Sequence, residues 1–415
     1  MKNLKKISYC RICGSGDLYD YLDLGILPIP NGFLTKGELK KAEKKYPLVI
    51  CFCRVCSLSQ LRYIVDPEIM FKNYLYIPSV SQTRVNNFKK FVEDARQRIK
   101  LNSKSLIVDI GSNDGALLNC FKNEGFRIVG VDPAGNLVKI AQLNGIPTEL
   151  GYFDSKLAKK MVKKYGAADV MFATNVFAHV HDLIEFLRGV DTLLSNNGIF
   201  VSQFPYVLDL IRENQFDTIY HEHLSYFSIK SLVKLSEKTN LEIYDIVPSH
   251  LDGGSLKVYW KKRKNKKIRL NNNIYELLNK EEKEGLYDEK TYDLFRKKVE
   301  YLKISAKKQL KKLKDEGKHI VGYGAAAKGN ILINYFDIDP HLFDYFVDST
   351  SYKQGRFTPG KHIPIFEEGK IFQTKPDYIL ILAWNFAEEI AKKNKEYLKN
   401  GGKFMICIPE FKILD

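Results

Sequence analysis

The chain has 415 residues, 45% of them hydrophobic, and carries a formal net charge of +16. This length exceeds one ordinary hydrophobic core, so we expect two or three domains. The sequence has no uncharged apolar run long enough to cross a bilayer, and its basic first residues lack the apolar stretch of a signal peptide. Composition therefore argues against a membrane-spanning or secreted protein and favours a cytoplasmic one.

The positive charge comes from 65 Lys and Arg residues against 49 Asp and Glu residues. Such an excess suits a nucleic acid, an anionic membrane or an anionic small molecule as partner. The lysines, however, are dispersed over residues 36–45, 261–267, 297–318 and 392–399, in patterns typical of solvated helix faces and loops. We therefore expect no nucleic-acid partner and no membrane partner, while an anionic substrate remains compatible with the charge.

Five of the seven cysteines lie within the first 56 residues, which in a cytosolic chain points to metal binding rather than disulfides. Two C-x-x-C loops, Cys10/Cys13 and Cys53/Cys56, can each place two thiolates on one side of a tetrahedral ion, and together they complete the shell of a structural zinc. Cys51 is an alternative to Cys53 as the zinc ligand paired with Cys56, but only Cys53 has two residues between it and Cys56. A redox pair is the alternative, and it is disfavoured because no βαβ pattern surrounds either loop.

The stretch between the two loops contains DLGILPIPNGFL, which is apolar and interrupted by Pro and Gly. It predicts an extended segment that packs on the following domain. A connector over residues 67–98 follows, in which Tyr74 and Tyr76 stand before a helical pattern over residues 84–99. Aromatic residues in such a connector serve packing or substrate contact, and the sequence leaves both roles open.

The middle of the chain, residues 101–262, has the pattern of an α/β domain. A buried strand over residues 106–110 runs into GSNDG and then a helix, which is the first unit of a doubly wound nucleotide-type site. Gly111 and Gly115 suit a turn in which the backbone passes close to a ligand. A second strand ends in Asp132, an acid placed to accept the hydroxyls of a ribose. Further strands are expected over residues 148–153, 169–174, 198–204, 241–247 and 255–260, which gives five parallel strands and a returning antiparallel edge.

The most distinctive cluster follows the fifth strand, where Tyr220, His221, Glu222 and His223 are consecutive. These residues could ligate a metal, but the H-E-H spacing differs from H-E-x-x-H on a helix. The histidines could also be packing residues. In a third interpretation the cluster is an acid/base set: a His transfers a proton, the Glu orients its ring and the Tyr stabilises an oxyanion. His179 follows the fourth strand, at the sheet edge where doubly wound sheets bind ligands.

Two charged amphipathic helices are expected over residues 270–286 and 290–316, followed by a second, smaller α/β unit. There GYGAAAKGN repeats the pattern of strand, small-residue turn and helix, and Lys328 adds a positive charge that suits a phosphate. The alternative is a unit used only for packing. Strands are expected over residues 343–348, 378–382 and 403–408, and the predicted domains are residues 1–72, 73–262 and 263–415.

DIGSNDG followed by GVDPA resembles the S-adenosylmethionine (SAM) methyltransferases. The resemblance implies a Rossmann-like central sheet whose first turn faces the methionine and ribose parts of SAM, with Asp132 holding the adenosine ribose. The cofactor-binding residues expected from it are Asp109, Gly111, Ser112, Asn113, Asp114, Asp132, Pro133, Phe153 and Asn175.

The resemblance becomes closer when nearly the whole chain is considered. The paired C-x-x-C loops, LGILPIPNGFL, NVFAHV, IYHEHLSYFS, GGSLKVY and GYGAAAKGN stand in the order found in the sugar C-methyltransferases, which act on nucleotide-linked keto-sugars. The family resemblance implies a nucleotide-sugar site in the C-terminal unit, with the diphosphate near the Gly-rich turn. The catalytic residues that it implies are His223, Glu222, Tyr220, His179 and a connector tyrosine, either Tyr74 or Tyr76. The substrate-binding residues expected are His221, Tyr323, Gly324, Lys328, Asn330, Asp348, Trp384 and Asn385.

The function implied by the resemblance is SAM-dependent C-methylation of a nucleotide-linked 4-keto-deoxysugar, at the carbon next to the ketone and through an enolate. The base is either His223, oriented by Glu222, or Tyr220 coupled to it. Two alternatives stay open: O-methylation of a nucleotide sugar or saccharide, which needs no ketone, and a zinc-containing methyltransferase that binds nucleic acid. We expect a monomer, with a homo-oligomer as the alternative.

Overall fold

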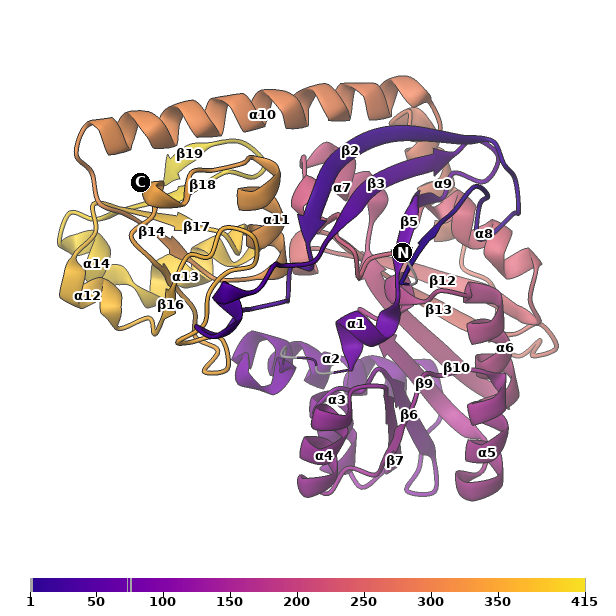
Figure 1. The fold of residues 1–415 in the computed structure, drawn as a ribbon. Coiled ribbons are helices and arrows are strands. Elements are labelled where there is room, and N and C mark those ends of the chain that lie inside the picture. Colours follow the sequence, from indigo (N-terminus) through magenta and orange to yellow (C-terminus); the bar gives the residue numbers. More distant parts are fainter. Residues whose placement is uncertain (1–2, 73, 75–76, 415) are drawn as a thin grey trace.

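The computed structural model describes residues 3–72, 74 and 77–414. Figure 1 shows an N-terminal hairpin in indigo that arches above the junction between a central α/β unit in purple to pink and a C-terminal α/β unit in orange to yellow. The predicted α/β class, with a doubly wound central sheet and a second parallel-rich sheet, is confirmed.

The N-terminal part contains a four-stranded sheet of order β11-β4-β3-β2 and a two-stranded sheet of β1 and β5. Its strands are β1 (Leu4–Lys6), β2 (Leu18–Pro28), β3 (Lys45–Cys53), β4 (Ser59–Leu61), β5 (Tyr63–Val65) and β11 (Ser225–Tyr226). β11 comes from far along the chain, begins two residues after His223, and pairs with β4. The edge of the N-terminal sheet is therefore supplied by the segment that carries the Tyr-His-Glu-His cluster.

The central unit is a seven-stranded sheet of order β12-β13-β10-β9-β6-β7-β8. Its strands are β6 (Leu106–Ile110), β7 (Arg127–Asp132), β8 (Thr148–Leu150), β9 (Ala168–Thr174), β10 (Leu194–Pro205), β12 (Leu241–Ser249) and β13 (Ser255–Lys262). The five strands predicted to be parallel pair in parallel, and β12 runs in the same direction, since it is antiparallel to β13 and β13 is antiparallel to β10. The prediction that the antiparallel strand forms the edge is wrong, because β13 turns back from β12 and inserts between β12 and β10.

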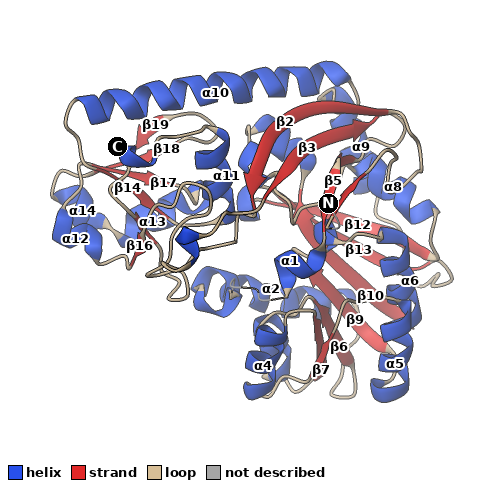
Figure 2. Ribbon diagram, in the orientation of Figure 1, coloured by secondary structure: helices blue, strands red, loops and turns tan. Residues whose placement is uncertain are grey.

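Helices lie on both sides of this sheet (Figure 2), so β6 is buried along its whole length, as its mostly apolar sequence predicts, and this burial includes Asp109. The helices of this region are α1 (Pro67–Phe71), α2 (Gln82–Arg98), α3 (Ala116–Lys122), α4 (Gly135–Leu143), α5 (Ser155–Tyr165), α6 (Leu183–Leu193), α7 (Val207–Arg212) and α8 (Ile229–Glu237). α2 buries Phe88, Phe91, Val92 and Ala95, which are the positions that its helical pattern marks as apolar.

The C-terminal unit is a six-stranded sheet of order β16-β15-β14-β17-β18-β19, parallel except for β19. Its strands are β14 (Ile320–Tyr323), β15 (Phe346–Val347), β16 (Ile365–Phe366), β17 (Tyr378–Ile381), β18 (Lys403–Ile406) and β19 (Lys412–Leu414). Its helices are α9 (Asn273–Lys283), α10 (Glu289–Asp315), α11 (Ala327–Tyr335), α12 (Lys370–Thr374), α13 (Ala387–Lys393) and α14 (Lys395–Lys399). The strand expected over residues 343–348 is shorter than predicted, since only its centre pairs in ladders with both neighbours.

The three parts share one continuous apolar core. The long helix α10 runs across the N-terminal and C-terminal parts (Figure 1). Its Tyr292 ring lies 4.7 Å from Tyr21 and 4.5 Å from Phe52, both in the N-terminal hairpin. In the part of the chain that the structure describes, none of the helices combines the length and the apolar character needed to span a bilayer.

The Pro- and Gly-rich insert is held by the C-terminal unit as well as by the central one. Leu34 forms a β-bridge with Phe357, and Asn330 of α11 donates a 2.7 Å hydrogen bond to the Pro30 carbonyl. The insert therefore packs farther along the chain than predicted, and it closes one side of the space between the two parallel sheets.

Candidate functional site

The four cysteines of the two C-x-x-C loops converge on one point. Their Sγ atoms all lie within 4.8 Å of one another, with 3.4 Å between Cys10 and Cys56 and 3.5 Å between Cys13 and Cys53. The Cys51 thiol instead points to the Gln60 carbonyl, at 3.4 Å. Four clustered cysteine sulfurs fit the closed tetrahedral shell of a structural zinc.

A cavity of about 590 Å³ lies where the carboxyl ends of both parallel sheets meet. The turns after β6, β7 and β9 line one side of it, and the segments after β14 and β17 line the other. Both sheets thus direct the ends of their strands, where α/β folds bind ligands, into the same space.

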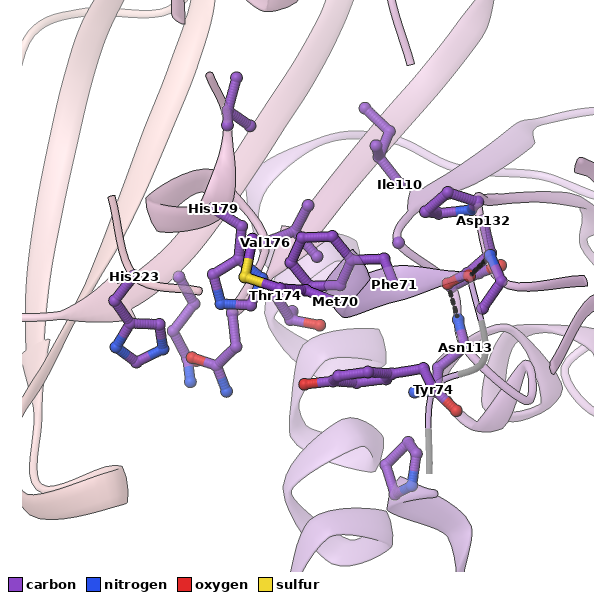
Figure 3. Close-up of a pocket in the computed structure, with 18 of the residues that line it drawn as sticks. Met70, Phe71, Tyr74, Ile110, Asn113, Asp132, Thr174, Val176, His179 and His223 are labelled. Atoms are coloured by element: carbon purple, nitrogen blue, oxygen red, sulfur yellow. Dashed lines mark hydrogen bonds between the residues drawn. The ribbon is translucent and has the colours of Figure 1, made fainter. Parts of the chain in front are cut away.

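The turn after β6 forms the cofactor side of the cavity. The Asp132 carboxylate accepts 2.8 Å hydrogen bonds from the Asn113 and Ala134 backbone N–H groups (Figure 3). These bonds fix both oxygens, and each retains a lone pair for a ribose hydroxyl, so the residues fit the adenosine part of SAM. Gly111 has a φ of +70°, and a Cβ there would stand 2.3 Å from Val176, which is why this turn requires glycine.

Most of the expected cofactor residues line this cavity. They are Asp109, Gly111, Ser112, Asn113, Asp132, Pro133, Phe153 and Asn175. Burial raises the pKa of both Asp109 and Asp132. Asp114 points elsewhere, because its Oδ1 accepts a hydrogen bond from the Ala116 N–H in the first turn of α3.

Two histidines stand side by side deeper in the cavity. The ring centroids of His179 and His223 are 5.0 Å apart, and Tyr220 lies 3.9 Å from His223. Burial lowers the pKa of His179 to about 4, and burial together with His179 lowers the pKa of His223 well below its usual range. Both rings are therefore neutral at neutral pH.

The tautomer of His223 follows from its one backbone contact. Its Nδ1 lies 3.0 Å from the Thr218 carbonyl, which can only accept a hydrogen bond. Nδ1 therefore carries the proton, and Nε2 keeps a free lone pair. We expected Glu222 to orient this ring, but the Thr218 carbonyl holds it instead.

Glu222 is buried at the meeting point of three distant segments. Its Oε1 accepts a 2.7 Å hydrogen bond from the Asn31 side chain, and its Oε2 accepts a 2.9 Å hydrogen bond from the Tyr74 phenol. Burial raises the pKa of Glu222 to about 7. Tyr74 is thus the connector tyrosine that the structure brings to the cavity (Figure 3), whereas Tyr76 lies outside the described residues.

The C-terminal side of the cavity is charged. Lys328 donates a 2.9 Å hydrogen bond to the Asp252 carbonyl and lies 4.7 Å from the Trp384 ring centroid. The Asp252 carboxylate pairs with Arg84 through two hydrogen bonds, one of them 2.9 Å long. The indole of Trp384 donates a 2.8 Å hydrogen bond to Asp217, and burial raises the pKa of Asp217 to about 6. Asn385 also lines this side.

The other expected substrate residues do not line the cavity. His221 contacts the Tyr46 carbonyl at 3.2 Å, and Asn330 binds Pro30. The Tyr323 phenol donates to Glu368, while Asp348 pairs with Lys353 at 3.1 Å. Gly324 shapes the turn after β14 with a φ of +87°. Of the eight expected substrate-binding residues, only Lys328 and Asn385 line the cavity. Trp384 contacts Lys328 but does not line the cavity.

Sequence reasoning missed several residues of this site. Asn31, Asp217 and Asp252 contact the expected site residues Glu222, Trp384 and Lys328 respectively, and Arg84 lines the cavity and pairs with Asp252. Asn31 stands in the PIPNGFL insert, which the sequence marks as unusual but for which only packing was expected. The contacts of the acids depend on chain folding, and the local pattern carries no signal for them.

This fold and site define a SAM-dependent methyltransferase with a structural zinc centre. Three family models match in succession: "Putative zinc binding domain" over residues 10–71, "Methyltransferase domain" over residues 84–246 and "C-methyltransferase C-terminal domain" over residues 250–409. Together they cover most of the chain, and they confirm the predicted class of enzyme and both predicted cofactors, SAM and zinc.

The chain is 34% identical to the C-methyltransferase NovU of Streptomyces niveus, over 99% of this chain and 98% of that protein. It therefore belongs to the C-methyltransferase family. A ubiquinone biosynthesis O-methyltransferase of Rhodopseudomonas palustris (strain TIE-1) is 27% identical to this chain, over a region that covers 28% of this chain and 50% of that protein. Among solved structures, a SAM-dependent methyltransferase from Anabaena variabilis ATCC 29413 covers 46% of this chain and 97% of its own, with a TM-score of 0.35 and 14% identity.

Proposed function

We propose that this enzyme methylates a nucleotide-linked 4-keto-deoxysugar at the carbon next to the ketone. When bound, SAM supplies an electrophilic methyl group, so the acceptor carbon has to become nucleophilic. A sugar carbon becomes nucleophilic when a neighbouring ketone lets it form an enolate. The similarity to a C-methyltransferase over the whole chain supports carbon as the acceptor.

The observation that carries the proposal is the neutral His223 with its free Nε2. In the proposed step Nε2 takes the proton from the carbon beside the ketone, and the electron pair of the broken C–H bond moves into the enolate. Burial keeps the ring neutral before the reaction. The developing enolate charge then stabilises the imidazolium beside it, which offsets the cost of a buried cation.

Two neighbouring side chains support the enolate oxygen in this proposal. Tyr220 lies against His223, and burial raises its pKa well above the usual value, which favours Tyr220 as a hydrogen-bond donor rather than as the base. Nε2 of His179 is buried and has no hydrogen-bond partner among the described residues, so it is available to the substrate. Donors fixed before the reaction are the usual means of stabilising an oxyanion.

The charged side of the cavity supports a nucleotide-diphosphate sugar as substrate. Lys328 and the first residues of α11 line it, and among the described residues no side chain caps the first turn of that helix. A helix N-terminus with an adjacent lysine favours phosphate. In this arrangement residues 1–72, 73–262 and 263–415 serve zinc, SAM and the nucleotide sugar respectively, and they hold the two reactants in one space.

The test is incubation of the purified enzyme with SAM and nucleotide-linked 4-keto-6-deoxysugars in deuterated water, followed by mass spectrometry. We expect one methyl group to be added to the carbon next to the ketone. When SAM is omitted, we expect deuterium to be incorporated at that same carbon. The His223→Ala, Glu222→Ala double variant should lose both signals, whereas His341→Asn, an exposed histidine remote from the cavity, should keep them.

Two results would contradict the proposal. Methyl transfer at the wild-type rate by the double variant would exclude His223 as the base. Methylation of sugars that lack a ketone, giving an O-methyl ether without deuterium exchange, would identify O-methylation instead.

A further inference from the structure

The first zinc loop contacts the two segments that carry His179 and His223 through one side chain, that of Arg11. Arg11 stands between Cys10 and Cys13, and its backbone N–H donates a 3.0 Å hydrogen bond to the Gln60 side chain. The loop is closed by a 2.9 Å hydrogen bond from the Gly14 N–H to the Cys10 carbonyl. The Arg11 backbone is therefore fixed by the loop that presents two of the four thiols.

The Arg11 guanidinium leaves this loop and binds two segments of the central unit. Its Nη1 donates to the Val180 carbonyl at 2.9 Å and to the His181 carbonyl at 3.3 Å. Its Nη2 donates to the Leu224 carbonyl and to the Ser225 hydroxyl. The first two acceptors directly follow His179 in the sequence, and the other two directly follow His223. One guanidinium therefore binds the backbone just after both histidines and links the two segments.

The two segments have one direct backbone bond to each other, from the Leu224 N–H to the Ala178 carbonyl at 2.9 Å. Arg11 reinforces this contact, because the guanidinium is a rigid fork whose donors have fixed directions. The distance between the two segments sets the 5.0 Å separation of the two imidazole rings.

We propose that Arg11 is a positioning residue that couples zinc binding to the spacing of His179 and His223. The metal orders the loop, the loop places Arg11, and Arg11 joins the two histidine segments. The effect on catalysis rests on the proposed function, whereas the effect on the backbone of the two segments does not.

The second zinc loop provides a matched control. Arg54 stands between Cys53 and Cys56 in the position that Arg11 has in the first loop. It points outward, where it pairs with Asp17 at 2.7 Å and with Glu289, and both carboxylates are partly exposed. Replacement of Arg54 removes the same charge from the same kind of loop without touching either histidine segment.

The experiment compares zinc-loaded full-length wild type, Arg11→Gln, Arg11→Lys and Arg54→Gln by hydrogen–deuterium exchange with mass spectrometry. Peptides covering residues 176–184 and 220–228 report on the two segments, and a peptide covering β6 reports on global opening. Zinc per chain, kcat and KM are measured on the same samples.

We expect Arg11→Gln to keep its zinc and the protection of β6, while exchange in both reporter peptides rises at least about tenfold, a change typical of local opening. Its kcat should fall about 10- to 100-fold, the usual effect of removing a partner that orients a functional group, with KM for SAM unchanged. Arg11→Lys should give exchange rates and a kcat between those of wild type and Arg11→Gln, since lysine keeps the positive charge but lacks the planar, multiple-donor guanidinium. Arg54→Gln should match wild type in every measurement.

A second arm removes zinc from the wild type with a chelator. Exchange in the two reporter peptides should rise before that of β6. Reporter peptides that stay protected in Arg11→Gln or after zinc removal would overturn the proposal. So would a rise in exchange that is uniform over the whole chain in both Arg11 variants. Reporter peptides that open as expected in an enzyme that methylates no keto-sugar would refute the proposed function and leave the coupling standing.

Discussion

The Tyr74 phenol donates a 2.9 Å hydrogen bond to Oε2 of Glu222, although 148 residues separate them. The other carboxylate oxygen accepts from Asn31, which belongs to the insert of the zinc-binding part. Glu222 therefore joins the N-terminal insert, the connector and the Tyr-His-Glu-His segment beside the His pair. Substitutions at the Glu222 carboxylate and at its hydrogen-bond donors therefore test whether these three segments act together.

Replacing Tyr74 by Phe removes one of the two donors to the buried Glu222 carboxylate. A hydrogen bond to a charged group contributes about 1.5–3 kcal/mol, so we expect kcat to fall roughly 10- to 100-fold. The measurement is steady-state methyl transfer to the keto-sugar. Tyr287→Phe is the control, because that phenol donates to Glu281 at 2.7 Å, away from the cavity. Equal losses in both variants would mean that Tyr74 contributes only stability.

The pH profile should reveal the titration of Glu222. Burial raises its pKa from 4.5 to about 7, so the carboxyl is neutral below pH 7 and becomes a carboxylate above it. If the carboxylate is the active form, kcat/KM rises as the pH increases through about 7. Glu222→Gln should lack this rise. Asp217, with a pKa of about 6, titrates lower, so Asp217→Asn should keep the rise near 7. A flat wild-type profile from pH 5.5 to 8 would contradict this prediction.

Asp132→Asn should weaken SAM binding. The carboxylate faces the cavity and is held by two backbone N–H groups, and an amide in its place offers one acceptor oxygen instead of two. We expect affinity for S-adenosylhomocysteine, measured by calorimetry, to fall about 10- to 100-fold, equivalent to about 1.4–2.8 kcal/mol. Asp169→Asn serves as control, because Asp169 accepts from the Leu106 N–H at the opposite end of the sheet. Unchanged affinity in Asp132→Asn would exclude it as the ribose ligand.

Two neighbouring cysteines should differ in their effect on zinc content. Cys53→Ser removes one of four clustered thiols, so we expect loss of zinc and a lower melting temperature. Cys51→Ser should retain one zinc per chain, since its thiol binds the Gln60 carbonyl. Atomic absorption on dialysed protein measures both. Zinc retained in Cys53→Ser but lost from Cys51→Ser would reverse the assignment.

The sequence by itself determined the features that depend on local pattern. Buried strands, the glycine turn after β6, the acid at the end of β7 and the two C-x-x-C loops are each specified within a few residues, because side-chain period and backbone restrictions act locally. The choice of Cys53 over Cys51 followed from spacing, and the structure has the same four thiols together.

The tertiary structure decided which of the candidate residues face the cavity. His221 and His223 are separated by one residue, yet His221 contacts the Tyr46 carbonyl while His223 faces the cavity. The packing of β11 against the N-terminal sheet, together with the contact of His223 with the Thr218 carbonyl, fixes which face of this segment is turned inward. The insertion of β13 into the sheet, the role of Asn31 and the reach of Arg11 to Leu224 depend in the same way on contacts between distant segments. Such contacts follow from how whole elements pack, and no local period encodes them.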